Sequence, residues 1–174
     1  MFDKIALKFA KVSDFFEKIV KNVSIVVLVV LICTVFFQVS SRILTGKSFP
    51  EIEEFSIIMA AWLGFFTLSY AAKKKVHVRI DVFVGKLPSS VQHVISIIIS
   101  FVTLYASIYL VWYGWLLAEK KIQVPLAILP TNAGWWYIAF PIGFFFTSYF
   151  LLDHIIQEIK EMRDENKKSK GEVV

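Results

Sequence analysis

The sequence has few charged residues and almost no cysteine. Asp, Glu, Lys and Arg make up only 19% of the 174 residues, and 57% are hydrophobic, whereas a soluble domain typically has about 25% charged and about 45–50% apolar residues. The mean hydropathy is +0.65. This composition excludes an ordinary soluble domain and predicts an integral membrane protein.

Cys33 is the single cysteine and lies inside an apolar run. One thiol cannot form a disulfide framework or a thiol pair, so we expect a buried, inert side chain. Catalytic triads, phosphate-binding loops and metal-ligand clusters are not apparent either. The sequence therefore predicts no enzyme activity, no catalytic, substrate-binding or metal site, and no cofactor.

Long apolar runs are what the sequence does contain. Residues 55–72 have no ionisable side chain except tyrosine, and as a helix they would reach about 27 Å, close to the ~30 Å hydrocarbon core of a bilayer. Such a run must be helical in lipid, where every backbone polar group needs an internal partner. We therefore predict an all-α membrane protein with four transmembrane helices. The predicted spans are residues 23–42, 55–72, 91–118 and 133–156.

Lys and Arg are distributed unevenly between the segments outside these spans. Five lie before residue 22, five between residues 73 and 86, and five between residues 160 and 170, whereas the first and third loops have two each. Because Lys and Arg are retained on the cytoplasmic side, we expect both termini to be cytoplasmic (N-in/C-in). The net charge of +5 is then explained by topology and anionic lipid head groups, without nucleic acid.

The two ends of the chain are predicted to lie outside the spans. In residues 1–22 a phenylalanine-rich stripe lies opposite lysines at helical spacing, which favours an amphipathic helix in the membrane interface. An amphipathic helix packed within a bundle is the alternative. Residues 157–174 are highly charged, and we expect a cytoplasmic tail that extends the last helix briefly and then becomes disordered.

Small and polar residues recur along the spans. Ser56, Ala60 and Gly64 are spaced four residues apart, which allows another helix to approach closely. The indole N–H of Trp62 needs an acceptor in the membrane, within this chain or on another subunit. In the third span, one stripe predicts a helix-packing seam, with a polar track for a solute as the alternative. This stripe comprises Ser96, Ser100, Thr103, Ser107 and Gly114.

The predicted spans carry no charge near the bilayer centre, where charged groups usually serve a function. The residues alone therefore indicate a partner of a larger membrane protein. Two alternatives stay open. One is a small redox or haem-anchoring subunit, since His93 and His154 lie on neighbouring predicted helices. The other is a small transporter that acts by itself.

The order and spacing of several residues between positions 25 and 154 resemble those of a known family. These residues are Arg42, Glu53, Glu54, Trp62, Gly64, His77, Asp81, Leu87-Pro88, Gly114, Pro130 and the run from Trp136 to Gly143. In these residues the chain resembles the small membrane subunit (Q-type, DctQ-like) of a TRAP transporter, a tripartite ATP-independent periplasmic transporter.

The resemblance implies a function and partners. A periplasmic substrate-binding protein would deliver an organic acid, a sialic acid or a C4-dicarboxylate, to a complex in the bacterial inner membrane. The large membrane (M-type) subunit would carry the substrate and sodium sites and move by an elevator mechanism. The small subunit would be non-catalytic, surrounded by membrane lipids and packed on the static scaffold of the large subunit.

Structural or partner-contact roles are predicted for a set of residues. We expect Arg42 to form an ion-pair cluster with Glu53 and Glu54, with independent interfacial charges as the alternative. We expect His77, Arg79 and Asp81 to hold a cytoplasmic loop, with solvated charges as the alternative. The complete set is Arg42, Glu53, Glu54, Trp62, Gly64, His77, Arg79, Asp81, Pro130, Trp136, Tyr137, Pro141 and Gly143.

Overall fold

The structure is a computed structural model that describes residues 2–75 and 89–171. His77, Arg79 and Asp81 lie outside the described residues. The elements are α1 (Phe2–Thr45), α2 (Pro50–Lys75), α4 (Ser89–Lys121), the short α5 (Gly134–Tyr137) and α6 (Ala139–Gly171). Four helices are long and apolar enough to cross a membrane. The predicted all-α fold with four spans is confirmed.

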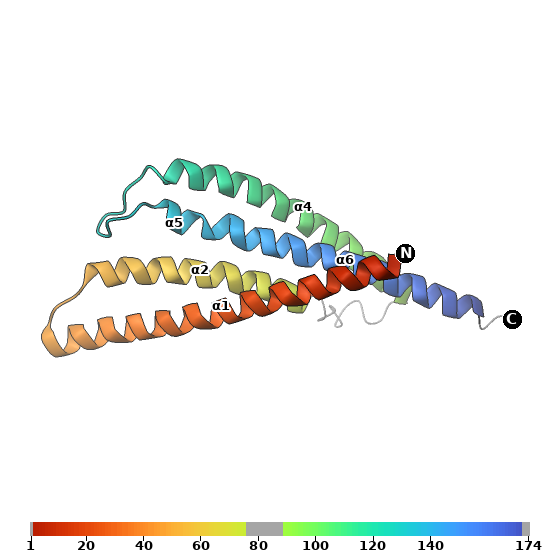
Figure 1. Cartoon of the computed structure of the whole chain (residues 1–174), viewed down its shortest axis with the longest axis horizontal. Coiled ribbons are helices and arrows are strands. Elements are labelled where there is room, and N and C mark those ends of the chain that lie inside the picture. Colours follow the sequence, from red (N-terminus) through yellow and green to blue (C-terminus); the bar gives the residue numbers. More distant parts are fainter. Residues whose placement is uncertain (1, 76–88, 172–174) are drawn as a thin grey trace.

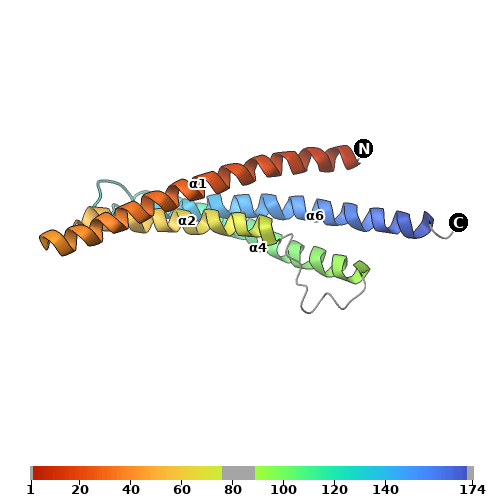
Figure 2. The same cartoon turned by 90° about the horizontal axis from the view of Figure 1, so that it is seen from below.

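The four long helices run side by side as an up-and-down bundle (Figure 1). The connections α1–α2 and α4–α5 lie at one end, which we call the connection end, and both chain ends lie toward the other, the terminal end (Figure 1). The view from below shows the N-terminal part of α1 and the start of α4 diverging on opposite sides of α6 (Figure 2).

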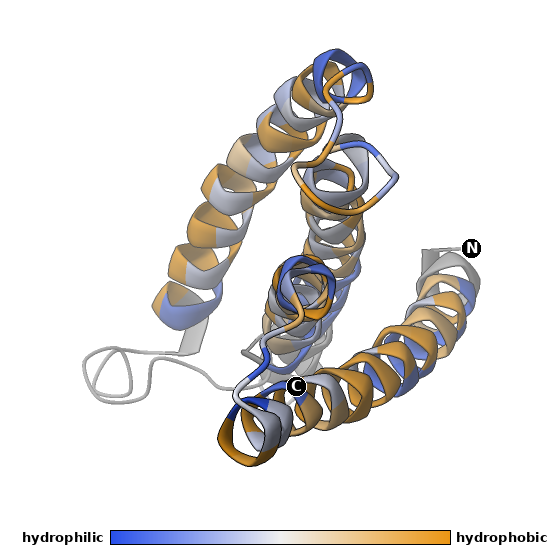
Figure 3. Cartoon of the chain, turned by 90° about the vertical axis from the view of Figure 1, so that its left-hand side faces the viewer, coloured by the Kyte–Doolittle hydropathy of each residue, from blue (hydrophilic) through white to orange (hydrophobic). Residues whose placement is uncertain are grey.

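Helix α6 forms the interior of the bundle, in contact with α1, α2 and α4. In its most apolar stretch 56% of the residues are buried, against 0% in that of α1. Phe150, Leu151 and Ile155 of α6 are among the most buried side chains. The end-on view shows hydrophobic residues along much of α1 and α4 (Figure 3), and many of their side chains are exposed on the outer faces of these helices. Such faces fit lipid or another protein, because water would not solvate them favourably.

Helix α1 continues without a break through the predicted boundary at residue 22. Its N-terminal half packs on the bundle, since Ser13 and Val20 are buried and the rings of Phe9 and Phe16 lie 5.0 and 5.2 Å from that of Tyr149. This packing agrees with the alternative prediction of an amphipathic helix packed within a bundle. A location in the membrane interface stays a prediction.

Short sequence signals explain where the helices begin and end. Gly46, with a φ of 67°, donates its N–H to the Arg42 carbonyl and ends α1. Pro50 opens α2, followed by Glu51 and Glu53 in the first turn, where negative charge is favourable. Pro141 lacks the N–H that would bond the carbonyl of Tyr137, and the helix is interrupted just before it, between α5 and α6.

The last helix extends further than the sequence predicts. Residues 157–171, expected to be a largely disordered tail, continue α6 to Gly171.

Glycines mark the closest helix contacts of α6. A Cβ on Gly143 would lie 2.6 Å from the Cβ of Phe65 on α2, and one on Gly114 would lie 2.5 Å from the ring of Phe140. Ser100 and Ser107 of α4 are also buried, so the predicted seam does pack helices. Thr103 is the exception, because it is exposed and bonds back to the carbonyl of Ile99.

Candidate functional site

A buried lysine ties three helices together at the terminal end. The Nζ atom of Lys73 on α2 lies 2.7 Å from Asp153 Oδ2 on α6 and 2.8 Å from Ser13 Oγ on α1. Asp14, which is largely exposed, lies 3.4 Å from the same amine. We call Lys73, Asp153, Ser13 and Asp14 the Lys73 cluster. Asp153 Oδ1 is buried without a hydrogen-bond partner in the described part of the chain.

A second polar cluster joins α4 to α6 at the same end. His93 Nδ1 lies within hydrogen-bond distance of Glu158 Oε2. Ser96 Oγ lies 3.2 Å from Glu158 Oε1 and 3.1 Å from His154 Nε2. We call these four residues the His93 cluster, and all but Ser96 are more than nine-tenths buried. Both imidazoles converge on one Ser–Glu pair, which is not the arrangement of two axial ligands on opposite faces of a haem.

Glu54 holds the long loop at the connection end. Its Oε1 accepts the N–H of Ala127 at 3.1 Å, and its Oε2 accepts those of Ile128 and Leu129 at 3.1 and 2.7 Å. Nearby, Trp62 Nε1 donates to the carbonyl oxygen of Trp135 at 3.0 Å. The acceptor that was predicted for the indole N–H of Trp62 is therefore a backbone carbonyl of this chain.

The predicted ion-pair cluster of Arg42 is not formed among the described residues. Glu54 binds the loop amides instead, and Glu53 accepts a long 3.4 Å bond from Gln38. Backbone donors outcompete the arginine because three of them converge on one carboxylate and need a partner. Arg42 lies exposed near the end of α1.

Some of the other predicted contact residues lie near groups of this chain, and others are exposed on its surface. Pro130 lies in the loop directly after Leu129, whose amide Glu54 binds, and the ring of Tyr137 lies 5.7 Å from the Lys121 amine. Trp136 remains 40% exposed. Gly64 is exposed on α2, and a Cβ built on it meets no atom within 4 Å.

Gly64 belongs to a wider exposed strip of α2. Ile57, Ala60, Thr67 and Leu68 are exposed as well, and their spacing of three to four residues places them on one helix face. Of the small residues predicted to recur on α2, only Ser56 is covered within this chain, where its hydroxyl lies 3.3 Å from that of Thr34 on α1.

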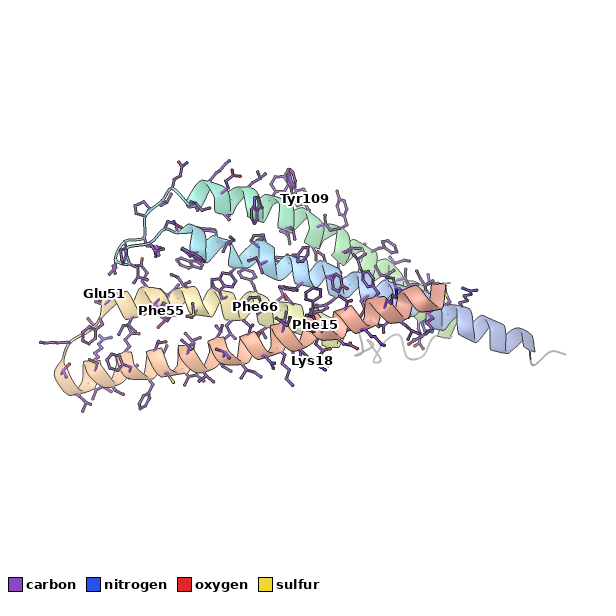
Figure 4. All side chains as sticks on the ribbon, viewed as in Figure 1. Phe15, Lys18, Glu51, Phe55, Phe66 and Tyr109 are labelled. Atoms are coloured by element: carbon purple, nitrogen blue, oxygen red, sulfur yellow. The ribbon has the colours of Figure 1, made fainter. Side chains whose placement is uncertain are left out.

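The outer faces of α1 and α4 also carry large apolar side chains. On α4 they include Ile98, Val102, Tyr105, Tyr109 and Trp112, all more than half exposed. Figure 4 shows Tyr109 directed away from the bundle.

A shallow apolar groove of about 420 Å³ lies between α1 and α2 at the connection end. Figure 4 labels Glu51 and Phe55 on its α2 side. The expectation of a buried thiol is wrong, since Cys33 is exposed along this groove.

The two terminal-end clusters could not be predicted directly from the sequence. Lys73 begins a run of three lysines and looked like a loop residue, and its partner Asp153 is 80 positions away. One usable signal was present. Asp153 stands inside the fourth apolar run and Ser13 lies beside the apolar stripe of residues 1–22, and polar residues in such places usually face a partner.

Comparisons with known proteins agree with this architecture. Residues 31–161 match the family described as the DctQ component of tripartite ATP-independent periplasmic transporters. A relative from Haemophilus influenzae, assigned as a TRAP transporter small permease protein, is 24% identical over 164 residues, which is 94% of this chain and 99% of that protein. The chain belongs to the DctQ family and is a small membrane subunit of the TRAP transporter type.

Proposed function

We propose that this chain is the non-catalytic small subunit that packs on the static scaffold of a large membrane subunit. In this role it supports sodium-coupled uptake of an organic acid, a sialic acid or a C4-dicarboxylate, delivered by a periplasmic binding protein. The large subunit carries the substrate and the sodium ions and moves by an elevator mechanism, while the small subunit stays fixed.

The exposed strip of α2 is the observation that best supports this role. Among the described residues, no atom lies within 4 Å of a Cβ built on Gly64, although Gly143 and Gly114 are both needed for close helix contacts. A glycine in a helix interior costs about 1 kcal/mol relative to alanine. Gly64 and Ala60 would allow a helix of the large subunit to approach closely, since small residues are enriched where membrane helices meet.

The polar clusters support a structural role for the bundle. Lys73 and Asp153 bond to each other, and Glu158 bonds to His93 and Ser96. These charges fix helices in place and are engaged by groups of the same chain. This supports our proposal that the large subunit carries the transported acid and its sodium ions.

The topology we propose has both termini in the cytoplasm and the chain in the bacterial inner membrane. It rests on the excess of Lys and Arg before residue 22, between residues 73 and 86, and after residue 160. Both chain ends lie toward one end of the bundle (Figure 1), as this topology requires. Labelling of single cysteines at positions 47 and 167 in a Cys33→Ser background, in intact cells, tests it, because only position 47 would react with an impermeant reagent.

Substitution of Gly64 by leucine tests the contact with the large subunit. We expect Gly64→Leu to leave this chain folded but to reduce its co-purification with the large subunit and the uptake by the complex. Ala106→Leu is the matched control, because Ala106 is an exposed small residue on α4. Loss of the complex with Ala106→Leu and not with Gly64→Leu would place the contact on α4 instead.

Reconstituted uptake tests the remaining parts. The complex, its binding protein and a sodium gradient would be assembled in liposomes with labelled N-acetylneuraminate or succinate. We expect uptake of one of them only with all three components present. Uptake without the small subunit at the full rate would refute a supporting role.

A further inference from the structure

The seam between α4 and α6 carries a second feature beyond its packing role. His93 on α4 and Glu158 and Glu161 on α6 each offer a ligand atom, and these atoms lie within 4.8 Å of one another. His93 and Glu158 are buried, whereas Glu161 is exposed. Glu158 and Glu161 are three residues apart on α6, so both carboxylates share one face of the helix. Two helices therefore direct three ligand groups to one point with an opening to solvent.

We propose that His93, Glu158 and Glu161 bind a divalent transition metal, with zinc as the best match. One imidazole and two carboxylates suit zinc and related ions, whereas calcium and magnesium prefer sites made of oxygen alone. Ligand bonds to zinc are about 2.0–2.2 Å long, so ligand atoms on one tetrahedral zinc lie roughly 3.3 Å apart. The three ligand atoms, which lie within 4.8 Å of one another, would have to rearrange to this spacing on binding.

Neighbouring hydrogen bonds orient Glu158 for this role. Ser96 Oγ donates to Glu158 Oε1 at 3.2 Å, which leaves its lone pairs to accept from His154 Nε2 at 3.1 Å. Glu158 Oε2 faces His93 Nδ1. Metal ligands are commonly held in this way by a further shell of hydrogen bonds. On binding, the metal would replace the hydrogen that links Nδ1 to Oε2, and these two atoms would move apart to make room for it, while Ser96 and His154 stay as supports.

The bound ion would join α4 to α6 at the terminal end of the bundle. The seam between these helices also contains small residues such as Ser100, Ser107 and Gly114, and the buried Leu104, which packs with Leu151 and Ile155. Three protein ligands leave one tetrahedral position open, and the exposure of Glu161 lets water fill it.

Zinc binding to the full-length chain tests the proposal. The protein would be purified in detergent through an affinity tag without histidine, in a Cys33→Ser background, and titrated with zinc chloride by calorimetry. Cobalt chloride would report the ligand geometry by its visible absorption. Glu161→Gln is the decisive variant, because an exposed side chain can be changed without unfolding the bundle. Glu119→Gln, at an exposed glutamate near the opposite end of α4 from His93, is the matched control.

We expect one zinc per chain, bound equally by the parent and by Glu119→Gln. Glu161→Gln should weaken binding more than Ser96→Ala, for which the loss of an outer hydrogen bond predicts a change on the order of 10-fold. Zinc should also raise the unfolding temperature of the parent and of Glu119→Gln more than that of Glu161→Gln. Absence of saturable binding to the parent, or equal binding by the parent and Glu161→Gln, would overturn the proposal.

Discussion

The Lys73 cluster allows one stability prediction to be worked out in detail. Lys73 and Asp153 are 2.7 Å apart, and their side chains are only 5% and 2% exposed. Lys73→Met removes the amine and keeps a side chain of similar length. The carboxylate of Asp153 then stays buried without its ion-pair partner, and its Oδ1 is already without a hydrogen bond among the described residues. Breaking one side of a buried pair costs about 3–5 kcal/mol.

Adding a second substitution distinguishes the loss of the ion pair from the cost of burying an unpaired charge. When both charges are replaced by apolar side chains, as in Lys73→Met with Asp153→Leu, a buried pair is often neutral or more stable by about 1–4 kcal/mol. The double variant should therefore be more stable than Lys73→Met alone. Asp14→Asn is the control, because Asp14 lies 3.4 Å from Lys73 but is 63% exposed, and exposed ion pairs contribute about 0–1 kcal/mol.

Thermal unfolding in detergent, followed by tryptophan fluorescence, measures these differences. At about 2–4 °C per kcal/mol for a chain of this size, Lys73→Met should lower the midpoint by roughly 6–20 °C. Asp14→Asn should lower it by less than about 4 °C. The reasoning fails if Lys73→Met unfolds near the wild-type temperature, or if the double variant is no more stable than Lys73→Met.

Two further predictions concern the loop and the glycines. Glu54→Gln should weaken the binding of the loop by about 1–3 kcal/mol, because an amide cannot accept all three N–H groups; faster hydrogen exchange at those three amides would show it, and Glu53→Gln should leave them unchanged. Gly143→Ala should destabilise the bundle by about 1–3 kcal/mol, because its Cβ would clash with Phe65, and Gly64→Ala should not; a lower unfolding midpoint for both variants would contradict the difference in packing.

The number of spans could be predicted from the sequence because it depends on local composition. An uncharged run of about 18 residues must be helical in lipid. The predicted runs overlap four stretches that are long and apolar enough to cross a membrane, and the fourth stretch is interrupted between α5 and α6. The predicted ends of the helices were less accurate. Helix α1 passes through residue 22 without a break and α6 continues to Gly171, since charged residues end the contact with lipid but need not end a helix.

Contacts between distant residues could not be predicted in the same way. Arg42 was expected to meet Glu54 because both lie near the same loop, yet Glu54 binds amides 73 to 75 residues further along. The choice depends on a loop conformation that presents three N–H groups together, and composition does not encode it. The sequence predicted that the indole N–H of Trp62 needs an acceptor, but not which one. Nothing close to Trp62 in the sequence indicates the carbonyl oxygen of Trp135.

The distribution of these bonds indicates which helix can serve as a fixed support. Apolar side chains gain little by leaving lipid for protein, so polar bonds and close packing hold membrane helices together. Helix α2 is bonded to the C-terminal half of the chain at its start by Glu54, in its second half by Ser69 to the Gly143 carbonyl at 2.7 Å, and near its end by Lys73. A shift of α2 along α6 would break all three. Gly64 therefore lies on a helix anchored along its length, which favours α2 as the surface on which a partner's static part would rest.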